Sequence, residues 1–319
     1  MGIGTRTRTP GRALVVAAAL AAGLLGAGTS SGAAAPGAVP GAVRQAPAGG
    51  SAPALDDTCD TAKSLPPARN AGGARIRKIR ERGTLVVGVD QNSYNWGYRN
   101  PQSGRIEGFD IDLARAVAAS VLGDPEKITY RTVPTARRIE AVKAGEVDML
   151  IRTVTITCDR LKEISFSAPY FEAGQRTVTP KAAKATSVAQ ALKGKRACSA
   201  AKTSSATELE SGKWGQATTK LLDNQLDCLV LMQQGQVDVT LTDGVAAYAQ
   251  AAQDPRVEVS PDTIVPAWMG IAVNQGDPDL VAWINAVLAE YRSNGGWKAS
   301  YDRWLAPTMG PVPGFSLPS

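Results

Sequence analysis

The amino-acid sequence predicts an α/β protein built from two similar lobes. Strand-like and helix-like segments alternate over residues 76–177, an order typical of a mostly parallel sheet with helices on its faces. The same alternation recurs over residues 178–263. The phrase KAGEVDMLI in the first half is echoed by QQGQVDVTL in the second, each a helix end, a Gly turn and a buried strand. These phrases indicate matched positions in two lobes, and a single larger sheet is the alternative.

The first lobe is expected to begin at Ile76 with a short basic helix, followed by TLVVGVD, an apolar run typical of a buried strand. The next segment, GFDIDLARAVAASVLG, has helical spacing, and the helix dipole favours its acids Asp110 and Asp112 in the first turn. Gly123 and Pro125 are expected to end this helix. KITYRTV is then predicted as a strand, RRIEAVKAGEV as a helix and VDMLIRTVTI as a strand. The buried face of the first long helix is predicted to contain Ile111, Ala114, Ala118, Val121 and Leu122.

In the second lobe, LKGKRACSAA is predicted as a strand, TSSATELE as a helix start, CLVLMQQGQV as a helix and VDVTLTD as a strand. The polar stretch AGQRTVTPKAAKATS, which precedes them, is expected to cross between the lobes. Residues 264–306 are expected to return to the first lobe as the strand AWMGIAVN and two helices broken at Gly295 and Gly296. Residues 307–319 are expected to form a short tail.

The N-terminus is typical of a secretory signal, which predicts an exported protein. Basic residues around Arg6 to Arg12 precede ALVVAAALAAGLLGAG and then small residues, so residues 1–35 are expected to be removed by cleavage between Ala27 and Ala35. The apolar run is shorter than the ~20 residues needed to cross a bilayer, and an uncleaved N-terminal anchor is the alternative. Residues 36–75 are rich in Ala, Gly, Pro and Ser and are expected to form a flexible tether of a secreted, cell-surface-associated protein.

Composition excludes several classes of function. The 319 residues carry a net charge of +6, part of it in the signal, and show no basic block, which argues against nucleic acid as a partner. The chain has no His, which excludes the usual zinc sites and every His-dependent nucleophilic triad. We expect no metal and no cofactor.

Four cysteines are present, and an even number in an exported chain favours disulfides. Cys198 lies in the opening strand of the second lobe, and Cys228 opens a helix expected to pack on that sheet. We expect these two to pair, which leaves Cys59 to join the tether to Cys158. The alternative is that Cys59 is a free thiol in the N-terminal segment.

Across about residues 76 to 306 the chain resembles the periplasmic-type substrate-binding proteins of polar amino-acid ABC transporters, solute-binding family 3. The resemblance is carried by an ordered set of segments: LVVGVD, GFDIDLARAVA, IEAVKAGEVDMLI, TVTITCDRLKEISFSAPYF, LKGKRACSAAKTSSATEL, GQVDVTLTD, GIAV and GGWKASYDRWL. VDQNSYNWGYRNP, with the cysteines in TCDR, RACS and LDCLVL, is most similar to actinobacterial glutamate- or glutamine-type binding proteins. The resemblance implies a monomer with the two-lobed type II periplasmic-binding-protein fold, in which two strands cross between the lobes and a ligand is clamped in the cleft.

A free amino acid carries a carboxylate and an ammonium whose desolvation is costly, so a closed site must supply a guanidinium and a carboxylate. The resemblance assigns the α-carboxylate to Arg160, assisted by the hydroxyl and amide of Thr155. It assigns the ammonium to the Asp243 carboxylate and to the backbone carbonyl of Thr153. Arg138 matches the arginine that reaches a distal carboxylate in glutamate- and aspartate-binding relatives.

The resemblance assigns further residues to the walls of the cleft. Thr203 and Ser204 match a loop at a helix N-terminus, where free backbone amides attract a carboxylate, although Ala201 and Lys202 replace the common Ser and Gly before them. Asp90 matches an acid that lines the cleft, and Arg152 is a second candidate cation, with solvent exposure or an acidic neighbour as its alternatives. Tyr94 and Trp96 are candidates for an aromatic wall over the ligand, and a core position is the alternative for both.

The function expected from the resemblance is extracytoplasmic binding of a free amino acid and its delivery to an ABC-type permease, with no covalent change. Glutamate or aspartate is the expected ligand, with glutamine or asparagine next, because two arginines facing one dry cleft require an anion between them. One alternative is an amino-acid sensor that docks on a membrane signalling partner. Another is a dehydratase-type enzyme on the same fold, since fold alone does not determine chemistry.

Overall fold

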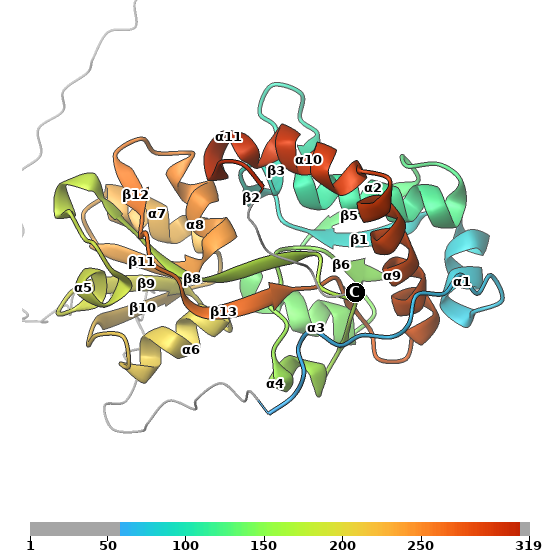
Figure 1. Cartoon of the computed structure of the whole chain (residues 1–319), viewed down its shortest axis with the longest axis horizontal. Helices are drawn as coiled ribbons and strands as arrows, with labels where there is room; N and C mark the ends of the chain where they lie inside the picture. Colours follow the sequence, from blue (N-terminus) through green and yellow to red (C-terminus); the bar gives the residue numbers. More distant parts are fainter. Residues whose placement is uncertain (1–57, 313–319) are drawn as a thin grey trace, which may run out of the picture. The chain divides into compact units, whose positions relative to one another are not determined.

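The first of the two large β-sheets lies in the half of the fold that contains both helix α1 and helix α9 (Figure 1). The computed structural model describes residues 58–312. The strand order in this sheet is β5 (Ile128–Thr132), β1 (Leu85–Val89), β6 (Met149–Leu150), β14 (Ala272–Val273) and β7 (Ser165–Phe166). Strands β5, β1 and β6 are parallel, and β14 runs antiparallel to both of its neighbours.

The second sheet has the order β10 (Thr218–Leu222), β9 (Arg196–Ala200), β11 (Val239–Asp243), β8 (Phe171–Pro180) and β12 (Val257–Val259), and β13 (Ile264–Met269) also pairs with β8. A small third sheet contains β2 (Asn92–Ser93), β3 (Gly97–Arg99) and β4 (Ile106–Glu107).

Strands β8 and β13 connect the two large sheets. They pair antiparallel, with Phe171 opposite Met269 at the end near the first sheet. Strand β8 follows β7 of the first sheet, and β13 leads into β14, so the chain passes once in each direction (Figure 1). The expected two-lobed fold with two crossing strands is therefore confirmed. The lobe boundaries expected at 177/178 and 263/264 fall inside β8 and at the start of β13.

Helices cover both sheets. Those of the first lobe are α1 (Ala74–Arg82), α2 (Phe109–Leu122), the 3-10 turn η1 (Thr135–Arg137), α3 (Arg138–Lys143), α4 (Cys158–Leu161), α9 (Pro278–Ser293), α10 (Gly296–Trp304) and α11 (Ala306–Met309). Those of the second are the 3-10 turn η2 (Lys181–Ala183), α5 (Val188–Leu192), α6 (Ser204–Ser211), α7 (Gln225–Gln233) and α8 (Gly244–Ala251). Among residues 58–312, no helix combines the length and apolarity that a membrane span requires.

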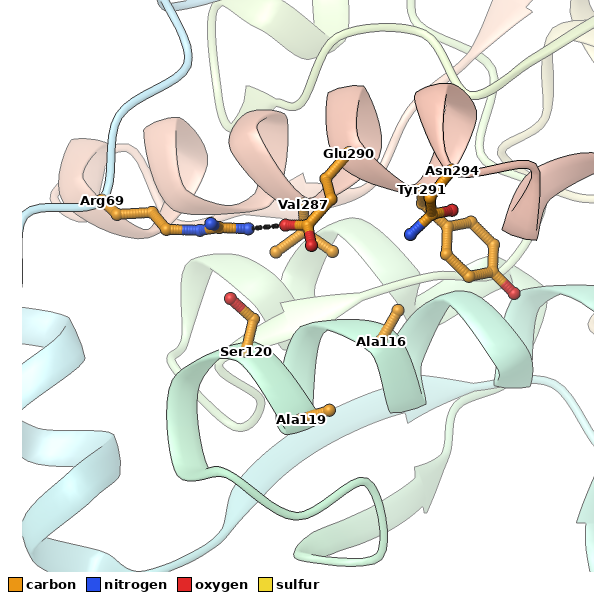
Figure 2. Close-up of a pocket in the computed structure, with 8 residues that line it drawn as sticks. All are labelled: Arg69, Ala116, Ala119, Ser120, Val287, Glu290, Tyr291 and Asn294. Carbon is orange, nitrogen blue, oxygen red and sulfur yellow. Dashed lines mark hydrogen bonds and ion pairs between the residues drawn. The ribbon is translucent and has the colours of Figure 1, made fainter.

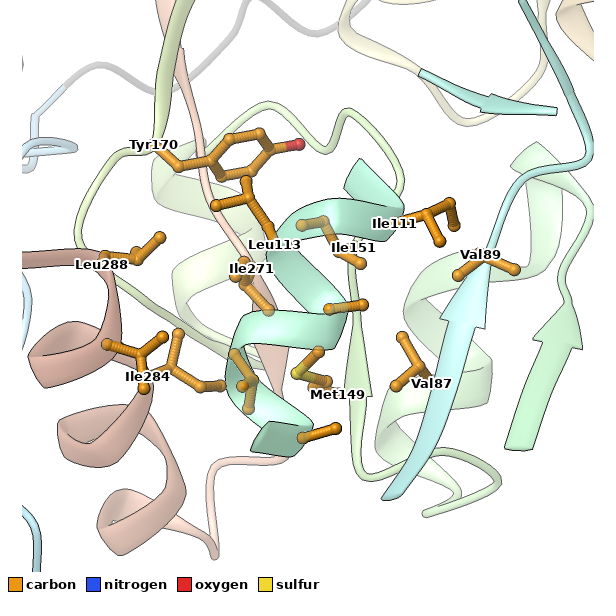
Figure 3. Packing of buried hydrophobic residues seen from close by; sticks show 14 of the residues in the cluster. Val87, Val89, Ile111, Leu113, Met149, Ile151, Tyr170, Ile271, Ile284 and Leu288 are labelled. Carbon is orange, nitrogen blue, oxygen red and sulfur yellow. The ribbon is translucent and has the colours of Figure 1, made fainter. Parts of the chain in front are cut away.

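The first sheet is buried on both faces because its side chains alternate between two clusters. Val87 and Met149 belong to the cluster formed with α2 and α9, whereas Val86 and Leu150 belong to the cluster formed with α3. Figure 3 shows α2 between strand β1 and helix α9. Four members of the predicted α2 face, Ile111, Ala114, Ala118 and Val121, are buried, and Leu122 is half-buried. Each fully buried large aliphatic side chain contributes roughly 1.5–3 kcal/mol.

Gly108 determines where α2 begins. Its φ of 132° lies in the region that favours glycine, and a Cβ there would lie 2.4 Å from the carbonyl oxygen of Trp96. The amide of Asp110 donates to the same carbonyl over 2.9 Å. The first turn of α2 is therefore held close to the loop that follows β1.

Several predicted elements differ in extent. The strand expected over VDMLIRTVTI is reduced to β6, because Thr153 has a φ of 47° that no strand can accommodate. The helix expected over CLVLMQQGQV begins earlier, at Gln225, and ends at Gln233, before the left-handed Gly235. Strands β10 and β12 and helix α8 were not predicted, and AWMGIAVN is divided between β13 and β14.

The segment before α1 lies on the first lobe, so the tether expected to extend to residue 75 is shorter than predicted. Cys59 is bonded to Cys158, and the Ser64 hydroxyl donates to the carbonyl of Phe166 over 2.8 Å. Asn285 of α9 donates to the carbonyl of Leu65 over 2.7 Å. These contacts use a disulfide and backbone groups, which an apolar pattern does not reveal. The predicted signal peptide (1–35), the rest of the tether and residues 313–319 lie outside the described residues.

Both predicted disulfides are confirmed. Cys59 pairs with Cys158 at the start of α4, and Cys198 of β9 pairs with Cys228 of α7. All four cysteines of the chain are described, and none of them is free.

Candidate functional site

A polar cavity lies between the two lobes, at the ends of strands β1, β6, β9 and β11. Residues of the first lobe that line it are Asp90, Ser93, Thr135, Arg138, Arg152, Thr153 and Thr155. Those of the second are Thr203, Ser204, Ser205, Gln225, Thr242, Asp243 and Ala246. The cavity has a volume of about 20 Å³, close to the ~10–15 Å³ that one water molecule needs. The lobes therefore enclose a small cavity that both of them line.

The first-lobe wall contains an ion pair between the buried Arg152 and the half-buried Asp90. Nη2 of Arg152 lies 3.0 Å from Oδ2 of Asp90, and Nη1 donates to the hydroxyl of Thr135 over 2.9 Å. Asp90 also accepts from the Ser93 hydroxyl over 2.7 Å and from the amides of the two residues that follow it. Arg152 therefore has an acidic neighbour within the wall, which was one of the alternatives for it.

Arg138 begins helix α3 and is 4% exposed. Its Nε has no hydrogen-bond partner among the described residues. Burial lowers the pKa of Arg138 well below its usual value, and the charges of Arg160 and Arg152 lower it further, while Asp243 and Asp90 act in the opposite direction. A buried guanidinium with an unsatisfied donor favours an anionic or oxygen-rich ligand.

Asp243 ends strand β11 and caps helix α8, where its Oδ1 accepts from the amide of Ala246 over 2.9 Å. Burial raises the pKa of Asp243, while the Ala246 amide and the charges of Arg138 and Arg152 oppose that shift. A carboxylate that faces the same cavity as an arginine can hold the cationic group of a zwitterion.

Arg160 lies in the short helix α4 and bridges the lobes. Its Nη1 donates to the carbonyl of Thr155 over 2.6 Å, and its Nη2 donates to the carbonyl of Lys202 in the second lobe over 3.3 Å. The Thr157 hydroxyl caps the helix by accepting from the Arg160 amide. Burial lowers the pKa of Arg160 to about 10. Arg160 lies beside the cavity rather than among the residues that line it.

The second-lobe wall is the N-terminus of α6. Thr203 is its N-cap and accepts from the amide of Ala206 over 3.0 Å. Gln175 of the crossing strand β8 is fully buried, and its Nε2 donates to the Ser204 hydroxyl over 3.2 Å. The Ser205 hydroxyl donates to Oε1 of Gln175. Sequence reasoning missed Gln175 and Ser205, and the polar TSS run after β9 was the one available signal for Ser205.

The two candidate aromatic residues lie outside the cavity lining. Trp96 is 1% exposed, and its ring lies 4.8 Å from that of Phe171 and 5.3 Å from that of Phe109, edge-on to both. Tyr94 is exposed, with its ring 4.9 Å from that of Tyr98. Trp96 therefore takes the core position, because the start of α2 and the crossing strand cover it, and neither ring forms a wall over the cavity in this structure.

A larger hollow of about 510 Å³ lies between α2 and α9 (Figure 2). The α2 side is formed by the small residues Ala116, Ala119 and Ser120. Arg69 and Glu290 pair with each other there, with side chains 44% and 56% exposed. These two side chains are exposed and paired with each other, whereas Arg138 and Arg152 of the interlobe cavity are buried. Among residues 58–312, no group of three or more His, Cys, Asp or Glu could hold a metal. The interlobe cavity is therefore the candidate site.

The chain is similar in sequence and in structure to several amino-acid-binding proteins. The chain is 33% identical over 230 residues to an ABC transporter glutamine-binding protein of Bacillus subtilis (strain 168), covering 72% of this chain and 84% of the relative. It is 24% identical over 250 residues to a glutamate-binding protein of Corynebacterium efficiens, covering 75% and 83%. The solved structure of an ancestral arginine-binding protein bound to glutamine aligns with a TM-score of 0.64 and 32% identity, covering 70% of this chain and 98% of that one.

Residues 85–307 match the family model of the bacterial extracellular solute-binding proteins, family 3. This match includes both sheets, the crossing strands and every residue that lines the interlobe cavity. The chain therefore belongs to the bacterial extracellular solute-binding proteins, family 3.

Proposed function

We propose that this protein captures a free amino acid with an acidic or amide side chain between its lobes and delivers it to an ABC-type permease. One observation carries the proposal: the buried guanidinium of Arg138 and the half-buried carboxylate of Asp243 face one cavity that both lobes line. A zwitterion supplies a partner for each sign of charge. Relatives described as binding glutamine and glutamate support this ligand class.

Within this proposal, each end of the amino acid has its own partners. Asp243 and the carbonyl of Thr153 receive the ammonium, and Arg160 receives the α-carboxylate together with Thr155. The amides at the start of α6, after Thr203 and Ser204, add donors for a carboxylate. The geometry supports these roles because Thr153, Thr155 and Asp243 line one cavity, and Arg160 lies against Thr155.

The side chain of the ligand is assigned to Arg138. Arg152 already has the Asp90 carboxylate 3.0 Å away, whereas Nε of Arg138 is unsatisfied. Glutamate or aspartate would supply a full counter-charge there, and glutamine or asparagine would supply an amide oxygen. A leucine side chain would leave the guanidinium buried without a partner, so apolar amino acids are rejected.

The protein makes no covalent change in its ligand under this proposal. It acts outside the cytoplasm as a monomer, at the cell surface, and the relative named as an ABC transporter glutamine-binding protein supports a membrane permease as its partner. Calorimetric titration of the purified mature protein with each of the twenty amino acids tests the proposal. Saturable heat with glutamate, aspartate, glutamine or asparagine supports it, and no heat with any amino acid would contradict it.

A further inference from the structure

Thr153 adopts a backbone conformation that a β-branched residue rarely takes. Its φ is 47°, in the left-handed region where the Cβ crowds the backbone. Such a conformation costs free energy and persists only where surrounding contacts hold it. Thr153 is 8% exposed and lines the interlobe cavity, so its strained peptide forms part of the candidate site.

The contact that holds this peptide comes from Asp110, in the first turn of α2. Oδ2 of Asp110 accepts from the amide of Thr153 over 3.2 Å, and Oδ1 accepts from the hydroxyl of Tyr170 over 3.0 Å. Figure 3 shows the Tyr170 ring at the end of α2 that carries Ile111 and Leu113. Asp110 is 2% exposed and lies outside the residues that line the cavity. It therefore acts on the cavity through the backbone of Thr153.

We propose that Asp110 is a positioning residue for ligand binding, whose ionised carboxylate holds the left-handed Thr153 peptide against the cleft. This inference rests on the proposed function of that cleft. A hydrogen bond to a charged carboxylate is roughly twice as strong as one to a neutral group. Protonation of Asp110 loosens the Thr153 peptide and weakens ligand binding.

The surroundings of Asp110 bring this change within the physiological range of pH. Burial raises the pKa of Asp110 to about 7, and the hydrogen bonds from Tyr170 and Thr153 oppose that shift. Two charged groups also face it, Asp90, which raises the pKa, and Arg152, which lowers it. Ligand affinity therefore falls as the pH drops through about 7. Asp243 is a second acid in the site with a raised pKa, and its own titration remains when Asp110 is replaced.

The experiment is a calorimetric titration of the wild type and of Asp110→Asn with L-glutamate and L-glutamine, from about pH 5.5 to 8. The glutamate side chain, with a pKa of ~4.3, stays ionised over this range. We expect Asp110→Asn to weaken binding at about pH 8 by roughly tenfold and to abolish the step in affinity near neutral pH. A purely structural role for Asp110 would lower thermal stability without removing that step.

Two further variants keep the test independent of whether Asp110→Asn folds. Tyr170→Phe removes a donor that favours the ionised carboxylate, so the step in affinity should move to higher pH. Glycine adopts the left-handed conformation without strain, so Asp110→Asn should weaken binding less when combined with Thr153→Gly.

Asp112→Asn is the matched control, because this carboxylate lies in the same turn but accepts from Ser300 and Trp304 of α10. Asp112→Asn should keep the wild-type change in ligand affinity near neutral pH. If the wild type binds an amino acid with no step near neutral pH, or if Asp110→Asn keeps the step and the affinity, the inference is wrong while the proposed function stands. If the wild type binds no amino acid, the proposed function itself fails.

Discussion

Lys202 of the second lobe forms an ion pair with Glu140 of the first, with 2.6 Å between Nζ and Oε1. The carbonyl of the same lysine accepts from Arg160, so Lys202 contacts the first lobe through both its side chain and its backbone. The amide of Ala136 adds a hydrogen bond across the cleft, to the carbonyl of Asp223 over 3.2 Å. A movement that separated the lobes would break these three contacts, so each of them stabilises the arrangement seen here.

The first prediction concerns the strength of this ion pair. Lys202→Gly removes the side chain but suits the left-handed backbone at this position, where φ is 59°. The side chain of Lys202 is 63% exposed and that of Glu140 is 50% exposed. Ion pairs this exposed stabilise a protein by only ~0.2–1 kcal/mol. Glutamate affinity should therefore fall by about fivefold at most, and less at high salt, as measured by calorimetry at two ionic strengths.

Glu140→Gln provides the partner for a double-mutant cycle with Lys202→Gly. The losses of glutamate affinity in the two single variants should not add in the double variant, because each substitution breaks the same ion pair. Lys143→Gly is a control in the same helix as Glu140, because its ion pair joins Glu163 within the first lobe. Fully additive losses, or an affinity that does not depend on salt, would show that the Lys202 side chain plays no part in closure.

The second prediction concerns the N-terminal segment. The disulfide between Cys59 and Cys158 closes a loop of 99 residues and ties that segment to the first lobe. Loss of such a crosslink typically costs ~2–5 kcal/mol. Paired Cys59→Ser and Cys158→Ser changes should lower the melting temperature and expose the chain before α1 to proteolysis. If the doubly substituted protein has the protection and melting temperature of the wild type, the segment is held by its hydrogen bonds alone.

The third prediction concerns the pH dependence of stability without ligand. The pKa of Asp110 is raised from its ordinary value of 3.8 to about 7 in the folded protein, so the folded state binds a proton that the unfolded state releases. The contribution of Asp110 to stability is therefore fully present below about pH 4 and is lost as the pH rises through about 7, at no more than ~1.4 kcal/mol per pH unit. Denaturant unfolding should show Asp110→Asn gaining stability relative to wild type across this window. A constant difference would show that the pKa of Asp110 is not raised in the folded protein.

Much of the fold was predictable because apolar periodicity and the alternation of strands and helices are local signals. Those signals placed Asp90 and Asp243 at the ends of strands, where residues of a parallel sheet approach a common cleft. The resemblance then brought together Arg138, Thr153 and Thr155, all of which line the cavity.

What the sequence did not reveal depends on contacts between distant segments. Gln175 belongs to a polar stretch with no marked pattern, and only the crossing strand brings it beside Ser204 and Ser205. The left-handed turn at Thr153 depends on Asp110, 43 residues earlier in the chain. The sequence alone allowed Trp96 either a core position or a contact with ligand. Packing against Phe109 and Phe171 makes it a core residue.

The last prediction concerns the choice of ligand. Arg138 is buried in the cavity with Nε unsatisfied, so a distal carboxylate would complete its contacts. Removing one partner of a buried charged pair typically costs ~2–5 kcal/mol, so Arg138→Ala should weaken glutamate binding by at least about thirtyfold. Glutamine should lose less, because its amide carries no net charge, and calorimetry with both ligands measures the difference. Arg137→Ala is the control, since that side chain is 64% exposed and pairs with Glu146. Unchanged glutamate affinity in Arg138→Ala, or a wild type that prefers leucine or lysine to glutamate, would show that Arg138 does not select the ligand, while Arg160 could still hold the α-carboxylate.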